Sequence, residues 1–516
     1  MSRLLGSFAT VGSWTMASRI MGFVRDIAMA AVIGTGPLAE AFFVAFRLPN
    51  MFRRFFAEGA FNMAFIPIFA KKLEGEGKDV ARIFGTEALS ALVAALIMLT
   101  LVAQAAMPWL VFALASGFEG EKFDLAVTFS RILFPYILFI SLAALFSGVL
   151  NAFDRFAAAA AAPVLLNIIW VAALGLVWAT GSDPGVVLPW AIAAAGLAQL
   201  ALVWWAARKL GMGLLPRRPR LTPDVRRLIV VGIPAALAGG VMQINLLVGT
   251  QVASYFEGAV AWLWMADRIY QLPLGVVGVA IGVVLLPELS RRFRAGDTAG
   301  TADAMNRAGE FSLILTLPCA VALVVIPELI TTALFERGAF TAEDSRATAM
   351  ALAVYAIGLP TFVLQKVLQP AFFARENTRT PLNFALVSMV VNVVVAIGLA
   401  PVIGFMAAAW GTTLAGLANL VLLWRGVQRL DPTLALDTRL AHRLPRILLA
   451  SLAMGAVVLG TAHLCKQVFP GTEPLIVLLV VPLGAVSYSV IGSRIGAFHM
   501  HEIKAAMRRR RKESEQ

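Results

Sequence analysis

Residues 381–424 read PLNFALVSMVVNVVVAIGLAPVIGFMAAAWGTTLAGLANLVLLW and contain no lysine, arginine, aspartate or glutamate. A helix needs about 20 mostly apolar residues to cross a bilayer, so this stretch is long enough for two helices. Pro401 and Gly404 lie between its halves, and such residues are typical of a tight turn. The stretch therefore predicts two adjacent membrane-spanning helices joined by a short connection.

The same apolar character extends over the whole chain. Of its 516 residues, 59% are apolar and 14% are charged, whereas soluble domains average about 45–50% and about 25%. A soluble fold of this length could not bury that excess, and the apolar content also excludes a disordered chain. Two cysteines are too few for a disulfide scaffold. The expected fold class is an all-α polytopic membrane protein, because such long uncharged runs do not fit the alternating strands of a β-barrel.

Apolar runs along the rest of the chain predict fourteen transmembrane helices in all. Most of these runs carry no charge, whereas the first two are interrupted by charged residues. The predicted helices cover residues 4–34, 38–72, 84–115, 124–153, 157–180, 186–209, 224–254, 259–289, 303–334, 343–374, 381–401, 404–427, 443–466 and 473–496.

Lysine and arginine are unevenly shared between the two sides of the predicted membrane. With the N-terminus in the cytoplasm, 31 of the 43 basic residues fall in cytoplasmic segments, and the outer loops hold only Lys122, Arg337, Arg346 and Lys466. Because cytoplasmic loops carry such an excess, both termini are expected in the cytoplasm. This distribution explains the net charge of +13 without nucleic acid.

Short motifs recur along the chain with a constant spacing. The segment 65–72 (FIPIFAKK) is similar to 285–292 (LLPELSRR), and the pair 113–114 (AL) recurs at 333–334, which is the same offset. The repeat predicts two parallel six-helix lobes related by a pseudo-two-fold axis along the membrane normal, an architecture that transporters use. Substrate is then expected between the lobes, near the middle of the membrane.

The predicted domains follow from this repeat. The chain divides into an N-lobe with helices 1–6, a C-lobe with helices 7–12, a pair of extra helices 13 and 14, and a basic cytoplasmic tail. The tail is expected to contact anionic lipid headgroups. The corresponding ranges are 1–222, 223–430, 431–500 and 501–516.

Six arginines fall inside predicted helices 1, 2 and 8, where each costs about 2.5–3.5 kcal/mol at a helix centre on insertion scales. They are Arg19, Arg25, Arg47, Arg53, Arg54 and Arg268, and the acids near them are Asp26, Glu40, Glu58 and Asp267. On helix 2, the charged residues at positions 40, 47, 54 and 58 lie within about 40° of one another, which predicts one polar stripe that faces inward.

Two interpretations account for these charges. The first is internal ion pairing, but the arginines outnumber the acids, and the Arg-Asp neighbours at 25–26 and 267–268 do not face each other on an ideal helix. The second is a water-filled cationic cavity that receives an anion. Arginine suits a cavity of this kind because its planar fork binds phosphate in two places and keeps its charge. The second interpretation is favoured.

The segments around these charges resemble a known family. Residues 18–26 (SRIMGFVRD), 41–50 (AFFVAFRLPN) and 53–61 (RRFFAEGAF) resemble the start of the MurJ (MviN) family, and 266–268 (ADR) and 285–287 (LLP) also match. The likeness covers almost the whole chain and includes the count of fourteen helices. The family comprises lipid II flippases of bacterial peptidoglycan synthesis, within the superfamily that includes MATE exporters.

The resemblance implies a function and a set of site residues. The function is movement of lipid II, the undecaprenyl-pyrophosphate-linked peptidoglycan precursor, from the inner to the outer leaflet of the cytoplasmic membrane by alternating access. The implied substrate-binding residues are Arg19, Arg25, Arg268, Arg53 and Arg54. The residues implied in cavity charge or gating are Asp26, Glu40, Arg47, Glu58 and Asp267. Helices 13 and 14 are expected to form a groove for the undecaprenyl tail.

No cofactor, metal or enzymatic activity is expected. The four histidines lack ligand spacing, and there is no Walker-type phosphate loop. Coupling to the membrane potential or to an ion gradient stays open, and the candidates for a cation site, Asn245, Asn392 and Thr412, have no acid among them. The expected partners are lipid II, membrane lipids and cell-wall synthesis proteins, with a monomer as the expected oligomeric state.

Two alternatives stay open at this point. One is a related MATE-like or polysaccharide-lipid exporter, although an exporter of cationic drugs would need an excess of acid inside the membrane, and this chain has the reverse. The other is a non-transporting scaffold for cell-wall enzymes. A scaffold has no use for six buried arginines, so its activity should survive their replacement by alanine.

Overall fold

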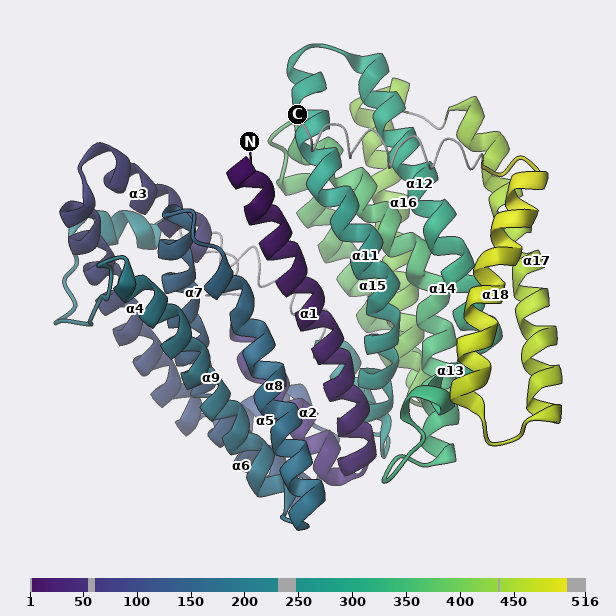
Figure 1. The fold of residues 1–516 in the computed structure, drawn as a ribbon, viewed down its shortest axis with the longest axis horizontal. Coiled ribbons are helices and arrows are strands. Elements are labelled where there is room, and N and C mark those ends of the chain that lie inside the picture. The colour runs from purple at the N-terminus through teal and green to yellow at the C-terminus, as the bar shows by residue number, and fades with distance from the viewer. Residues whose placement is uncertain (1, 54–60, 231–246, 435–436, 499–516) are drawn as a thin grey trace. The chain divides into compact units, whose positions relative to one another are not determined.

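The computed structural model describes residues 2–53, 61–230, 247–434 and 437–498 (Figure 1). This part of the chain contains helices and no strands, and ten of its helical segments, of which Gly120–Ala152 comprises two helices, are long and apolar enough to cross a membrane. The chain divides into two compact units, Met1–Ala261 and Trp262–Gln516. The expected class of an all-helical, multi-pass membrane protein is confirmed.

In the first unit, helices pack in pairs around buried aromatic side chains. Helix α1 packs on α8, both α7 and α8 pack on α9, and α2 packs on α6. Phe42, Phe134 and Trp170 are fully buried among them. The helices are α1 (Ser2–Ile33), α2 (Pro37–Arg53), α3 (Phe61–Gly75), α4 (Lys78–Ala105), α5 (Met107–Leu114), α6 (Gly120–Leu133), α7 (Tyr136–Ala152), α8 (Ala157–Thr180) and α9 (Pro184–Lys209).

In the second unit, α12 packs on α14 and on α17, α16 packs on both α14 and α15, and α17 packs on α18. The stretch 381–424 forms α15 and α16 as predicted, with Gly404 in a positive-φ conformation between them. The helices are α11 (Ala259–Arg294), whose first three residues belong to the first unit, α12 (Thr298–Val325), α13 (Pro327–Phe335), α14 (Ala342–Phe373), α15 (Arg379–Ile403), α16 (Met406–Leu430), α17 (Thr438–Val468) and α18 (Glu473–Arg494), with the 3-10 turn η2 (Pro432–Leu434) before α17.

Proline divides three of the predicted membrane helices, which appear as the pairs α4 and α5, α6 and α7, and α12 and α13. Pro108 and Pro327 stand in the first turns of α5 and α13, and Pro135 is the N-cap of α7. Proline lacks a backbone N–H and crowds the preceding turn, so one helix ends and the next begins. A single continuous helix is therefore wrong for residues 84–115, 124–153 and 303–334.

The helix boundaries repeat along the chain with the offset seen in the sequence. The offset between segments 65–72 and 285–292 also separates α4 from α12, both at their starts and at their ends. The same offset separates the start of α5 from the start of α13. The packing repeats as well, because α7 and α8 pack on α9 as α14 and α15 pack on α16. Residues 247–261 lie in the first compact unit, although the repeat assigns them to the second lobe. The fourteen-span count, the lobe arrangement and the lobe boundary after residue 222 stay predictions.

Candidate functional site

Arg25 of α1 is buried, with 6% of its surface exposed. Its Nη1 donates to Oδ1 of Asn167 on α8 at 3.0 Å, and its Nε and Nη2 donate to Oδ1 of Asp26 at 3.0 and 2.7 Å. Its guanidinium carbon lies 4.4 Å from the centre of the Trp170 ring, within the range of cation–π attraction. Three different groups therefore hold this cation in one orientation.

Helix α8 supplies two of these groups because Asn167 and Trp170 lie three residues apart on one face. Asn167 is itself held, since its Nδ2 donates to the backbone carbonyl of Ser18 on α1 at 3.1 Å. Trp170 packs edge-on against Phe42 and Phe46 of α2, at centroid distances of 5.5 and 4.8 Å. Helices α1, α2 and α8 thus fix the arginine together.

The prediction that Arg25 and Asp26 do not face each other is wrong. Neighbours on an ideal helix are about 100° apart, but the arginine side chain is long enough to fold back to the next carboxylate. Both side chains are buried, with exposures of 8% and 6%. Internal pairing, the first of the two interpretations, therefore applies to Arg25, whose charge Asp26 compensates.

Glu40, in the first turn of α2, is completely buried. Its Oε2 accepts a hydrogen bond from Nζ of Lys122 on α6 at 2.9 Å, and its Oε1 accepts one from the backbone N–H of Val260 at 3.1 Å. A buried carboxylate is tolerated only when it is paired and hydrogen-bonded. This arrangement, the Glu40 junction, ties the start of α2 both to α6 and to the first turn of α11.

A second set of contacts, which sequence reasoning missed, joins the connection between α5 and α6 to residues 251–255. The backbone N–H of Gly117 donates to Oγ of Ser254 at 3.0 Å, and Oγ of Ser116 lies 2.7 Å from the hydroxyl of Tyr255. A Cβ added to Gly117 would lie 2.6 Å from the carbonyl carbon of Ser254. Small uncharged residues in a loop carry no pattern that would have predicted this close approach.

Three of the other arginines assigned from sequence, Arg19, Arg47 and Arg53, are half-buried. Arg19 makes no hydrogen bond or ion pair with any residue in the described ranges. Arg54 and Glu58 lie outside the described residues. The polar stripe along helix 2 therefore stays a prediction.

Asp267 and Arg268 lie on α11 in the second unit, where both are half-buried. The guanidinium carbon of Arg268 lies 4.7 Å from the centre of the Trp264 ring. Asp267 accepts a hydrogen bond from Gln271, one turn further along the helix. Each unit thus places one predicted substrate-binding arginine against the face of a tryptophan: Arg25 in the first unit and Arg268 in the second.

The candidates for a cation site fall on α15, α16 and an undescribed segment. Asn392 is completely buried and lies against Gly411, the residue before Thr412. The hydroxyl of Thr412 donates to the carbonyl of Ala408 in its own helix at 3.1 Å. Asn245 lies outside the described residues. Among the residues that the structure describes, no group of three or more His, Cys, Asp or Glu side chains could hold a metal ion.

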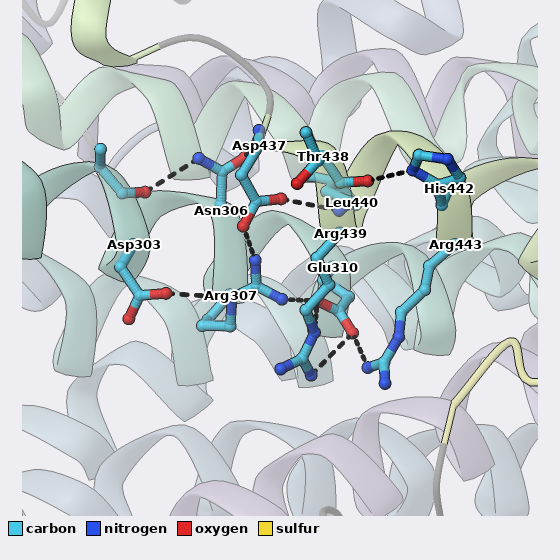
Figure 2. A network of polar contacts seen from close by, with 11 residues as sticks. Asp303, Asn306, Arg307, Glu310, Asp437, Thr438, Arg439, Leu440, His442 and Arg443 are labelled. Carbon is cyan, nitrogen blue, oxygen red and sulfur yellow. Dashed lines mark hydrogen bonds and ion pairs between the residues drawn. The ribbon is translucent and has the colours of Figure 1, made fainter.

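Sequence reasoning also missed a cluster of charged side chains around a buried carboxylate in the second unit (Figure 2). Glu310 of α12 is 4% exposed and accepts hydrogen bonds from Arg307, one turn earlier, and from Arg439 and Arg443 of α17. Arg307 also pairs with Asp437, the N-cap of α17. These five residues are the Glu310 cluster. In the sequence the three arginines count only as cytoplasmic charges, and the acid inside a predicted membrane helix is the feature that could have revealed their role.

The arginines of this site favour recognition of an anion over acid–base chemistry. A guanidinium keeps its charge when buried, and its fork matches the oxygens of a phosphate or carboxylate. Such contacts are stronger where water is excluded. A tryptophan face beside the cation limits its orientation, as at Arg25 and Arg268.

Sequence comparison places these observations in a family. Residues 29–479 match the profile of the protein family described as Lipid II flippase MurJ. A probable lipid II flippase MurJ of Rhizobium meliloti (strain 1021) is 45% identical, over 98% of this chain and 96% of its own length. The lipid II flippase MurJ of Burkholderia cenocepacia is 36% identical, over 83% of this chain and 84% of its own length.

Solved structures share the fold. A lipid II flippase MurJ in an inward closed conformation superposes with a TM-score of 0.79 at 24% identity, covering 94% of this chain and 98% of its own. An inward-facing multidrug transporter of the MATE family superposes with a TM-score of 0.70 at 14% identity, covering 82% of this chain and 98% of its own. The structural likeness shows the fold alone, whereas the family profile and the 45% identical relative show the family. The chain belongs to the lipid II flippase MurJ family.

Proposed function

We propose that this chain is a lipid II flippase of the bacterial inner membrane. It carries the undecaprenyl-pyrophosphate-linked peptidoglycan precursor from the inner to the outer leaflet. Family membership supports the substrate, and the ten apolar helices in the described ranges support a membrane transporter. The observation that carries the proposal at the site is the buried cation Arg25, which Asn167, Asp26 and Trp170 hold in place.

The pyrophosphate is the part of the substrate that the arginines would recognise. Asp26 occupies one edge of the Arg25 guanidinium. A phosphate oxygen can replace this carboxylate because both accept the same pair of N–H groups. Asp26 would then compete with the substrate and assist its release. The proposed contacts to the pyrophosphate come from Arg19, Arg25, Arg53, Arg54 and Arg268.

Transport would proceed by alternating access, with the Glu40 junction as part of the closure of one face. In the closed arrangement Glu40 is paired with Lys122 away from water. When the face opens, both groups regain hydration, which offsets much of the lost attraction. Binding of substrate can shift such an equilibrium only through its different affinity for the two states.

The remaining topology is also part of the proposal. Both termini lie in the cytoplasm, helices 1–6 and 7–12 form parallel lobes, and α17 with α18 accommodates the undecaprenyl tail. The charge distribution along the sequence supports the orientation. Energy would come from the membrane potential or from an ion gradient, with Asn245, Asn392 and Thr412 as candidates for the ion.

Complementation tests this function directly. In cells depleted of their own flippase, the wild-type chain should restore both growth and the exposure of lipid II at the outer face. Arg25→Ala and Arg268→Ala should reach the membrane in normal amounts and fail in both measurements. Lysine at either position should restore activity only in part, because it lacks the planar fork.

Arg346→Ala is the matched control, because this arginine side chain is 71% exposed. It should support normal growth and normal lipid II exposure. Normal growth with both Arg25→Ala and Arg268→Ala would contradict the anion cavity. Restored growth without exposure of lipid II would instead favour a scaffold.

A further inference from the structure

The second unit contains an apolar cavity of about 290 Å³ between α12, α14, α16 and α17. Its walls include Leu313, Leu364, Leu420 and Leu444, one from each of these helices. The lining residues come from the first half of α17, from the last halves of α14 and α16, and from Met305 to Leu313 of α12. The cavity therefore lies toward one end of the four helices, the end that the charge distribution assigns to the cytoplasm.

A cation stands at the wall of this cavity. Arg425, near the end of α16, is exposed and makes no hydrogen bond or ion pair with any residue in the described part of the chain. The arginines of the Glu310 cluster, by contrast, are paired with carboxylates. The charge of Arg425 is thus available to a ligand.

The Glu310 cluster, drawn in Figure 2, is hydrogen-bonded to two residues of the cavity wall. Asn306 and Leu440 both line the cavity. Oδ1 of Asn306 accepts the backbone N–H of Asp437 at 3.1 Å, and the carboxylate of Asp437 accepts the backbone N–H of Leu440 at 2.7 Å. The apolar cavity is thus bordered by charged side chains. The acyl region of a bilayer is bordered by its headgroups in the same way.

The cavity is also continuous with an apolar outer surface. Val421 lines it and is 39% exposed, and Leu417, one turn earlier on α16, is 47% exposed. An apolar cavity does not hold water well, so an apolar chain is the fitting occupant. No described residue of α18 lines the cavity, which separates it from a tail groove between α17 and α18.

We propose that this cavity binds one anionic phospholipid of the cytoplasmic leaflet, with an acyl chain in the cavity and the phosphate on Arg425. The ligand is complementary at both ends, because the walls are apolar and the rim is cationic. Basic pockets between membrane helices on the cytoplasmic side bind anionic headgroups, and a guanidinium offers two parallel donors to a phosphate.

Lipid binding to the purified full-length protein tests the charge. Bound phosphatidylglycerol and phosphatidylcholine with identical acyl chains are counted by native mass spectrometry. The wild type should retain one phosphatidylglycerol, with affinity roughly fivefold higher than for phosphatidylcholine, since one arginine near the surface contributes that much. Arg425→Ala should lose this preference. Arg429→Ala, an exposed arginine one turn later that does not line the cavity, should keep it.

A second pair of variants tests the cavity itself. Leu364→Trp should fill it and reduce retention of both phospholipids, whereas Val394→Trp, at a 63% exposed position on α15, should leave retention unchanged. Thermal unfolding of each variant checks that it is folded. Equal affinity for the two phospholipids, or equal loss in Arg425→Ala and Arg429→Ala, would overturn the proposal.

Competition with undecaprenyl phosphate distinguishes the two sources of a lipid phosphate. If it displaces phosphatidylglycerol at equal concentration, the cavity belongs to the polyprenyl tail and the proposal is wrong. Because binding is measured without transport, these outcomes are separate from those of the complementation test.

Discussion

Lys122 and Glu40 form an ion pair of 2.9 Å whose side chains are 17% and 0% exposed. The sequence placed the lysine in an outer loop, but α6 begins at Gly120, so Lys122 lies within the helix. The backbone N–H of Val260 satisfies the second carboxylate oxygen. Removing either charge would therefore leave its partner buried without compensation.

Glu40→Gln should destabilise the protein by up to about 3 kcal/mol, because Lys122 is left without its counter-charge in a largely buried place. The double variant with Lys122→Met should recover part of this loss, since it leaves no unpaired charge. Thermal unfolding of the purified variants measures both effects. If the destabilisation of the double variant equals the sum of those of Glu40→Gln and Lys122→Met alone, the ion pair is not the cause.

Gly117→Ala should impair transport, because its Cβ would lie 2.6 Å from the backbone of Ser254 and force these segments apart. Gly175→Ala is the matched control, because nothing lies within 4 Å of its added Cβ. Cysteines at positions 116 and 255 should cross-link readily in the control and less in the Gly117 variant. Equal cross-linking in both would show that the close approach is not needed.

Asn167→Leu should weaken the binding of lipid II by roughly tenfold or more, because a hydrogen bond to a charged group contributes about 1.5–3 kcal/mol. Gln199→Leu is the comparison: Gln199 is also buried, and it accepts a hydrogen bond from the Tyr136 hydroxyl and donates one to the carbonyl of Ala162. It should lower the unfolding temperature but not the affinity. Titration of the purified variants with lipid II separates the two effects, and similar affinities for both variants would contradict a positioning role for Asn167.

Glu310→Gln should destabilise the protein by about 3–5 kcal/mol, because it removes the charge of a 5% exposed carboxylate and leaves Arg443, which is 11% exposed, without its counter-charge. Glu288→Gln is the control, since this carboxylate pairs with Arg291 and Arg292 at a 31% exposed position. An exposed pair contributes about 0–1 kcal/mol. The thermal unfolding temperatures of the two variants should therefore differ clearly, and equal shifts would contradict the burial argument.

The sequence by itself determined the class of protein, the repeat and the family. The stretch 381–424 had to form helices, because backbone polar groups inside a bilayer must be satisfied within their own segment. Its division into α15 and α16 at Gly404 followed from local turn chemistry. The offset between segments 65–72 and 285–292 reappears between α4 and α12. A repeat of this kind is detected by comparing segments of the sequence, so no knowledge of tertiary contacts is needed.

The positions at which proline ends a membrane helix could not be predicted from the sequence alone. Hydropathy runs through Pro108 without a charged residue on either side, so it does not show that α4 ends just before this proline. The sequence contained this residue, but many other prolines in this chain lie inside helices, as Pro163 does in α8. Whether a proline ends a helix depends on the side chains and helices that pack around it.

Only the tertiary structure decided which charges meet. Periodicity predicted one polar stripe on helix 2, but not that Glu40 would reach Lys122, 82 positions away. It marked Arg25 as a costly charge, but not that Asn167, 142 positions away, would hold it. A helical repeat defines the face on which a side chain lies, whereas its partner depends on which distant helix packs against that face.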